Sequence, residues 1–125
     1  MLARPNRLTR RPDYVACYNT GRRYFSKHFI VFALERQDTA PVWRYGLAVS
    51  RKVGNAVRRN RTKRVLREFF RLYQDEMPGG MDLVVVPKRR LDPKRVSLDL
   101  VVQELLPLVC GIRDSQSCEA SDGTP

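Results

Sequence analysis

The sequence has little of what a protein catalyst or a metal site needs. One of its 125 residues is histidine, His28, and it falls in a segment that predicts a strand. The three cysteines, Cys17, Cys110 and Cys118, are odd in number and lack metal-ligand spacing, and no paired carboxylates stand out. We therefore expect no catalytic residues in the protein, no metal site, and reduced thiols rather than a disulfide framework.

Long apolar segments are missing as well. No run approaches the roughly 18 residues that span a bilayer, and the first residues, MLARPNRLTRRPDY, lack the apolar centre of a signal peptide. The loop 51–55 also lacks the glycine pattern and the Lys-Ser/Thr end of a Walker nucleotide-binding loop. These absences predict a cytoplasmic protein with no membrane partner and no small-molecule substrate.

Acidic residues are scarce relative to basic ones. The chain has 24 Lys and Arg against 13 Asp and Glu, which gives a formal net charge of +11. Such an excess favours a polyanion as the partner, and nucleic acid in particular when membrane features are missing. The apolar content of 42% allows a real core, and the length is that of one domain.

The densest basic segment is also amphipathic. Residues 59–71 read RNRTKRVLREFFR, and Leu72 and Tyr73 follow them. In a helix with 3.6 residues per turn, these side chains fall into an apolar arc and a basic arc on opposite sides. The segment therefore predicts a helix that packs on one side and binds an anion on the other. The inward arc holds Val65, Leu66, Phe69, Leu72 and Tyr73, with Phe70 at its margin, and the outward arc holds Asn60, Lys63, Arg64, Arg67 and Arg71.

The charge pattern of this region argues against a face that is merely solvated. Glu68 is the only acid in residues 43–73, a span with ten basic residues, whereas surfaces built for solubility mix the two signs. Arg58, Arg59 and Arg61 also crowd the predicted helix start, where the helix dipole disfavours cations. Phosphate groups bound there would reverse that penalty.

Around this helix, the hydrophobic pattern predicts an α+β fold. The expected order is helix, strand, strand, helix, strand, helix, which suggests helices packed on one small sheet. The last helix should kink or end at Pro107, and residues 111–125 are expected to form a disordered tail. The expected elements are a helix over 13–19, strands over 28–35, 43–50 and 81–87, the basic helix, and a last helix capped by Ser97.

One face of this sheet is expected to bind single-stranded nucleic acid. Ile30 and Phe32 fall on one side of the strand over 28–35, and Tyr14 and Tyr18, four residues apart, share a face of the first helix. Aromatic rings stack on bases without demanding a sequence, and arginines follow the phosphates. The alternative is that both tyrosines are core contacts with a polar tip.

The region around the basic helix resembles the signature of a known family. The run YGLAVSRKVGNAVRRNRTKRVLREFFR, residues 45–71, closely resembles that of the bacterial ribonuclease P protein subunit. Its core is GNAV, a basic residue, and then RNR, KR and RE at fixed spacing. The likeness extends through RLTRRPDY and the Gly21 turn in front and DLVVVPK behind, and it covers residues 5 to about 106.

The resemblance implies a fold and a function. Residues 1–110 would form one RNA-binding α-β-β-β-α-β-α sandwich, with a left-handed crossover at the basic helix, against the usual right-handed preference. The protein would bind the catalytic RNA subunit of ribonuclease P and, with it, remove the 5′ leader from precursor tRNA. The RNA would perform the hydrolysis, with Mg²⁺ at the RNA active site and not in a protein site.

The resemblance also implies which residues contact each RNA. Tyr14 and Tyr18 stand where phenylalanine is common in the family, which keeps the stacking surface and adds hydroxyl groups. The positions for the RNA subunit are Arg51, Lys52, Asn55, Arg58, Arg59, Asn60, Arg61, Lys63, Arg64 and Arg67, and those for the precursor-tRNA leader are Tyr14, Tyr18, Ile30 and Phe32.

Two other functions stay open from the residues themselves. One is a structural RNA-binding protein without a processing role, and the other is a protein that cleaves RNA by itself, for which the acid–base groups are poor. The tail lies outside the resemblance, so deletion of residues 112–125 is expected to leave processing unchanged.

Overall fold

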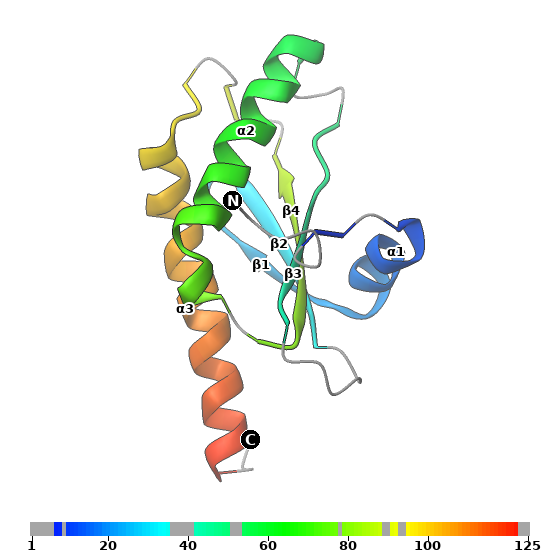
Figure 1. Ribbon diagram of the computed structural model, residues 1–125, viewed down its shortest axis with the longest axis vertical. Coiled ribbons are helices and arrows are strands. Elements are labelled where there is room, and N and C mark those ends of the chain that lie inside the picture. Colours follow the sequence, from blue (N-terminus) through cyan, green and yellow to red (C-terminus); the bar gives the residue numbers. More distant parts are fainter. Residues whose placement is uncertain are drawn as a thin grey trace.

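The chain folds into the α+β arrangement that the sequence predicts. The computed structural model describes residues 7–8, 10–35, 42–50, 54–77, 79–88, 91–92 and 95–122, with side chains up to residue 114. The observed order α-β-β-β-α-β-α confirms the one implied by the resemblance (Figure 1). The elements are α1 (Arg11–Thr20), β1 (Arg22–Phe25), β2 (Phe29–Glu35), β3 (Arg44–Leu47), α2 (Ala56–Leu72), the short 3₁₀ helix η3 (Gln74–Glu76), β4 (Met81–Pro87) and α3 (Leu98–Asp122).

The four strands form one mixed sheet in the order β1-β2-β4-β3. β1 and β4 both pair antiparallel with β2, whereas β3 and β4 are parallel, so α2 is a crossover connection between neighbouring strands. β4 lies inside the sheet, which explains why its sequence is a continuous apolar run. The residue pattern alone does not predict β1, because its four residues RRYF are mostly exposed and do not alternate clearly.

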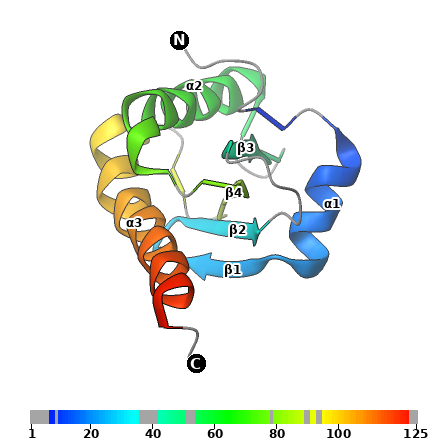
Figure 2. The same ribbon diagram turned by 60° about the horizontal axis from the view of Figure 1, so that its bottom comes forward.

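Helices cover the two faces of the sheet unequally. α2 and α3 lie on one face and α1 lies on the other (Figures 1 and 2). The larger core is formed between the sheet and α2 and α3, around residues such as Phe29, Leu83 and Leu105. A smaller core of Leu8, Cys17 and Val84 lies under α1, and burial raises the pKa of the Cys17 thiol to about 12.

The buried side of α2 differs in part from the predicted arc. Phe70, placed at the margin, is fully buried, and Leu72, placed inside, is 48% exposed. The reason is an aromatic stack, in which the ring centroids of Phe70 and Tyr45 lie 4.3 Å apart. Thr62 is also fully buried, and its hydroxyl donates to the carbonyl of Arg58 at 3.1 Å. The helix is therefore turned toward the aromatic residues of β3.

The last helix corrects two predictions. Pro107 does not end α3, which was one of the two outcomes expected there, because the helix continues to Asp122. Residues 111–125 are not a disordered tail from their start, because Ile112 is 2% exposed in the core. The apolar residues Leu105, Val109 and Ile112 lie before and after Pro107 at helical spacing, and all three are buried. Pro107 itself is exposed. The burial of these three side chains stabilises the helix on both sides of the proline.

The described residues contain few features of other functional classes. No helix in the covered part of the chain is long and apolar enough to cross a membrane. Nor do those residues include three or more His, Cys, Asp or Glu side chains grouped so that they could hold a metal ion.

Candidate nucleic-acid interface

The basic helix begins at a well-defined cap. Asn55 precedes α2, and its side-chain oxygen accepts a hydrogen bond from the backbone N–H of Arg58 at 3.0 Å. This bond satisfies one of the free donors at the helix start. Asn55, which the resemblance assigns to RNA binding, thus also has a structural role. Arg51 and Lys52 of the preceding loop lie outside the described residues.

Most cations of α2 have no acid to neutralise them. The side chains of Arg58, Lys63, Arg64 and Arg67 make no hydrogen bond or ion pair with any other residue that the structure describes. Glu68, the one acid of the helix, is instead bound to Arg71, whose Nε lies 3.1 Å and 3.2 Å from the two carboxylate oxygens. The unpaired cations therefore form a surface of strong positive potential.

Two further arginines at the start of α2 are partly engaged by the protein. Arg61 donates from Nη2 to the carbonyl of Val96 at 3.3 Å, which turns it toward the chain before α3. Arg59 is half-buried, and its Nε has no hydrogen-bond partner. The resemblance assigns both to RNA-subunit binding together with Arg64, whereas helix periodicity alone leaves both outside the outward arc that holds Arg64.

The N-terminal segment adds a cation that the sequence did not assign to the site. Arg7 forms a parallel bridge with Tyr45, and the N–H of Leu8 donates to the Tyr45 carbonyl at 2.8 Å. This backbone pairing carries the Arg7 side chain to the outward face of α2. No local pattern could have indicated this, because the pairing joins residues 38 positions apart.

Two adjoining pockets lie along this face of α2, between the helix and β3. The first has a volume of about 440 Å³, the second has a volume of about 200 Å³, and both are walled by Arg7, Tyr45 and Arg67. The first is also lined by Asn60, Arg64, Glu68 and Arg71, and the second by Leu8, Tyr14, Gly46, Leu47 and Lys63. Side chains with a net positive charge therefore surround both pockets.

The two tyrosines of α1 have different surroundings. Tyr14 is half-buried, and its hydroxyl donates to the carbonyl of Leu8 at 3.2 Å. Tyr18 is 41% exposed, and its ring meets that of Phe32 edge to face, with centroids 4.9 Å apart. Burial raises the pKa of both phenols, so both stay neutral. Tyr14 is fixed by packing and Tyr18 offers a ring to solvent.

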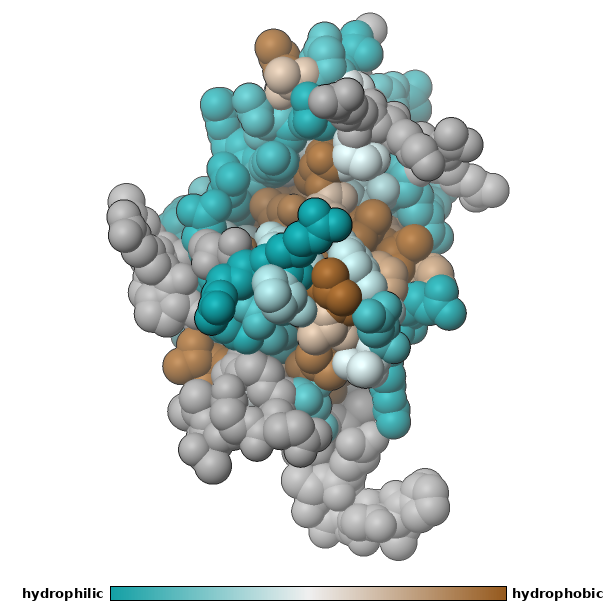
Figure 3. Space-filling model, turned by 90° about the vertical axis from the view of Figure 1, so that its right-hand side faces the viewer, coloured by the Kyte–Doolittle hydropathy of each residue, from teal (hydrophilic) through white to brown (hydrophobic). Residues whose placement is uncertain are grey.

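Ile30 and Phe32 lie on the sheet face that α1 covers in part. They alternate with the buried residues Phe29, Val31 and Ala33, which point to the other face. Both are half-buried, so they remain accessible beside Tyr18. A view onto this side shows apolar residues in the middle of the face with hydrophilic residues around them (Figure 3). We call the surface formed by Tyr18, Ile30 and Phe32 the sheet groove.

An ion pair fixes α1 on the sheet. Asp82 is 2% exposed, and its two carboxylate oxygens accept from Nε and Nη2 of Arg44 at 2.8 Å and 2.7 Å. Arg44 also lies 3.7 Å from a carboxylate oxygen of Asp13 in α1. This network joins β3 and β4 by two charge-assisted hydrogen bonds and reaches α1 by one longer ion pair, which helps to hold the helix of both tyrosines on the sheet.

The smaller pocket joins α1 to the basic face of α2. Tyr14 of α1 and Gly46 of β3 form one wall, and Lys63 and Arg67 of α2 form another. An extended anionic strand can therefore pass from aromatic side chains to unpaired cations without crossing an acidic surface. That combination is typical of proteins that hold single-stranded nucleic acid. The fold and this site together define a small α+β nucleic-acid-binding protein.

Comparisons with known proteins identify the family. The family model described as Ribonuclease P matches residues 2–109. The chain is 87% identical over 125 residues, all of both proteins, to the ribonuclease P protein component of Oleidesulfovibrio alaskensis. The solved structures that resemble it include the ribonuclease P protein of Thermotoga maritima, with 35% identity, a TM-score of 0.74, and coverage of 83% of this chain and 94% of that one. The Staphylococcus aureus protein has 26% identity, a TM-score of 0.72 and coverage of 86% and 94%.

This chain belongs to the bacterial ribonuclease P protein family. Its role is that of the protein subunit of ribonuclease P, and its partner is the RNA of that ribonucleoprotein. The resemblance that the sequence carries over residues 5 to about 106 is confirmed, and the family match extends it to residues 2–109.

Proposed function

We propose that the chain binds the catalytic RNA through the basic face of α2 and holds the 5′ leader of precursor tRNA in the sheet groove. The holoenzyme would then remove the leader to give the mature tRNA 5′ end, in the cytoplasm, where precursor tRNA is available. The observation that supports this proposal most strongly is the smaller pocket, because it places Tyr14 of α1, the helix that also carries Tyr18, next to the cations of Lys63 and Arg67. A strand of RNA that follows α1 would thus reach the basic face of α2.

The chemistry of the pockets supports RNA as the catalyst. The only acid among the described lining residues of the two pockets on α2 is Glu68, and it is bound to Arg71. His28 lines neither of them, and its Nδ1 lies 2.5 Å from a carboxylate oxygen of Glu104. Among the described residues that line these pockets, no unengaged carboxylate or histidine is available as a general acid or base. Mg²⁺ would bind at the RNA active site and assist the attack of water there.

One experiment tests the proposal and its two alternatives. Precursor tRNA is incubated with the protein alone, with the RNA subunit alone, and with both at low Mg²⁺ concentration. We expect efficient cleavage only with both components. Cleavage by the protein alone would show that the protein is itself the nuclease. Binding of the RNA subunit without any gain in cleavage would show a structural RNA-binding protein.

A further inference from the structure

The free edge of the sheet carries an exposed aromatic ring that the proposed function does not use. β1 pairs with β2 and lies at the end of the strand order. Phe25, its last residue, is 57% exposed. The side chain of Arg23, two residues earlier, is exposed and makes no hydrogen bond or ion pair within the described part of the chain. A large apolar ring beside an unpaired cation at a sheet edge suggests a binding surface.

The strand register places both residues on the same face as the sheet groove. Phe25 lies opposite Ile30, which lies opposite Val86 of β4, and Arg23 lies opposite Phe32. Residues directly opposite in a sheet point to the same side. The sheet groove therefore continues from Ile30 to Phe25, across one more strand spacing of about 4.8 Å.

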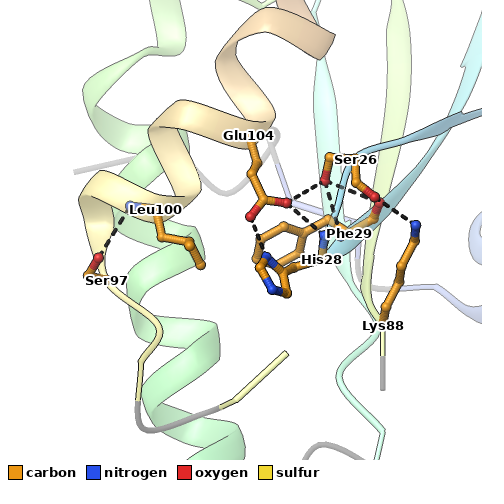
Figure 4. A network of polar contacts seen from close by, with 7 residues as sticks. All are labelled: Ser26, His28, Phe29, Lys88, Ser97, Leu100 and Glu104. Atoms are coloured by element: carbon orange, nitrogen blue, oxygen red, sulfur yellow. Dashed lines mark hydrogen bonds and ion pairs between the residues drawn. The ribbon is translucent and has the colours of Figure 1, made fainter. Parts of the chain in front are cut away.

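The ring of Phe25 is held in a rigid setting. Nζ of Lys88 lies 5.5 Å from the ring centroid and donates to the carbonyl of Ser26 at 2.6 Å. The turn after Phe25 is tied to α3, because Oε1 of Glu104 accepts from Ser26 Oγ and His28 N, and Oε2 contacts the His28 ring (Figure 4). A preorganised ring loses little entropy when a ligand stacks on it.

The chemistry of this edge fits a nucleotide of single-stranded RNA. A base can stack on Phe25 while Arg23 and Lys88 bind its phosphates. A second copy of this chain paired along β1 would instead bring Arg22 and Arg23 of both copies together, and like charges facing each other across paired strands are destabilising. Charge complementarity thus favours RNA over self-association.

We propose that Phe25 and Arg23 form the outer end of the sheet groove and bind the leader nucleotides farthest from the cleavage site. This inference rests on the proposed function. The basic face of α2 borders β3, at the opposite end of the strand order from β1. If the catalytic RNA binds α2, the leader leaves the cleavage site near β3 and reaches β1 only when it is long enough.

Leader length provides the test. Affinities of the holoenzyme are measured for two precursor tRNAs that differ only in the leader, about two or about ten nucleotides long. We expect Phe25→Leu to weaken binding of the long-leader substrate by about 5- to 100-fold, the range of one lost base stack. Binding of the short-leader substrate should not change. Phe25→Tyr, which keeps the ring, is the matched control and should retain the wild-type affinity for both.

Three results would overturn the inference in different ways. Equal affinities of wild type and Phe25→Leu for the long leader, with Tyr18→Ala still weakening it, would refute the outer site and leave the proposed function intact. No leader effect from either variant would refute the sheet groove as a whole. A change in sedimentation caused by Phe25→Leu would show a second copy as the occupant. Unchanged thermal unfolding of Phe25→Leu confirms that the protein is folded in each case.

Discussion

The ring of Tyr14 lies against the backbone of Gly46. A Cβ atom added at position 46 would be 2.6 Å from Cε1 of the Tyr14 ring, closer than real Cβ contacts. The sequence indicates that Gly46 and its neighbours Ala48 and Ser50 make one side of a strand small. The structure shows that a tyrosine of α1 uses the space, and that this contact forms the wall of the smaller pocket.

Gly46→Ala should destabilise the protein by about 1–3 kcal/mol, because the new methyl group displaces the Tyr14 ring from a packed position. The free energy of unfolding in urea measures the effect. Gly111→Ala is the matched control, since a Cβ there meets nothing within 4 Å and the residue lies in α3. That change should stabilise by about 0.5–1 kcal/mol. Equal unfolding midpoints for Gly46→Ala and wild type would contradict the packing role of the glycine.

Substitutions of Tyr14 and Tyr18 should have different effects, one on the stability of the protein and the other on leader binding. Tyr14→Phe removes the hydrogen bond to Leu8 and should lower the free energy of unfolding by about 0.5–1.5 kcal/mol, with leader affinity unchanged. Tyr18→Ala removes an exposed ring and should weaken binding of leader-bearing tRNA by about 1–3 kcal/mol. Mature tRNA serves as the control ligand. Equal losses for precursor and mature tRNA would rule out the sheet groove as the leader site.

The salt dependence of RNA binding should report the unpaired cations of α2. Arg64→Ala combined with Arg67→Ala should flatten the slope of log affinity against log salt concentration by about 1–2, because fewer counterions are released from the RNA. Glu68→Gln combined with Arg71→Gln removes an ion pair without changing the net charge, so its slope should match wild type. If the folded double variant Arg64→Ala, Arg67→Ala kept the wild-type slope, these two arginines would not contact RNA phosphates.

Glu104 should contribute stability that is lost in acid. Burial would raise the pKa of Glu104, but the hydrogen bonds from His28 and Ser26 outweigh it and hold the pKa below its ordinary value of 4.5. A lowered folded-state pKa stabilises the protein above the ordinary value, and this contribution disappears as the pH falls through the folded-state pKa.

The variant Glu104→Gln measures that contribution. It should be less stable than wild type by about 1–2 kcal/mol at pH 7, and the difference should shrink as the pH falls below 4.5. Urea unfolding at several pH values gives both curves. A constant difference from pH 7 to pH 3 would mean that the loss comes from packing and not from the charge of the carboxylate.

The stability of the fold should depend on α3 as far as Ile112. Ile112→Ala should destabilise by about 2–4 kcal/mol, as expected for an aliphatic side chain that is removed from a core. Deletion of residues 112–125 also removes Arg113 and its 2.5 Å ion pair with Glu76 of η3. The expectation that this deletion leaves processing unchanged is therefore revised, and lower thermal stability with reduced processing at elevated temperature is expected. A deletion of residues 115–125 keeps both contacts and is the control.

Much of the architecture could be predicted from local sequence. β4 and α2 were predicted because an uninterrupted β-branched run and a stripe of helical period are strong signals within one element. β1 was missed because RRYF has neither the length nor the alternation of a buried strand. The length of α3 was missed because proline penalises a helix locally, whereas burial of Ile112 stabilises it through a contact distant in sequence.

The candidate site also combines features that local sequence predicts with features that depend on contacts between distant residues. The identity of the cations on α2 is visible in the sequence, because the presence of one acid and ten basic residues in the span 43–73 is a property of composition. Which of them are unpaired is not visible, since Arg61 reaches the carbonyl of Val96, 35 positions away. Arg7 and Tyr45 joined the site for a similar reason, through a backbone bridge between distant segments.

The sequence by itself thus determined that the protein is a basic α+β domain with an anion-binding helix, and its motif indicated the ribonuclease P protein family. Those properties depend on net charge, on periodicity and on residues that are neighbours along the chain. Only the tertiary structure decided that Tyr14 is a packing residue and Tyr18 an exposed ring, and that Phe25 extends the groove. These differences depend on strand register and on which surfaces cover each side chain, and both are set by contacts between residues far apart in the sequence.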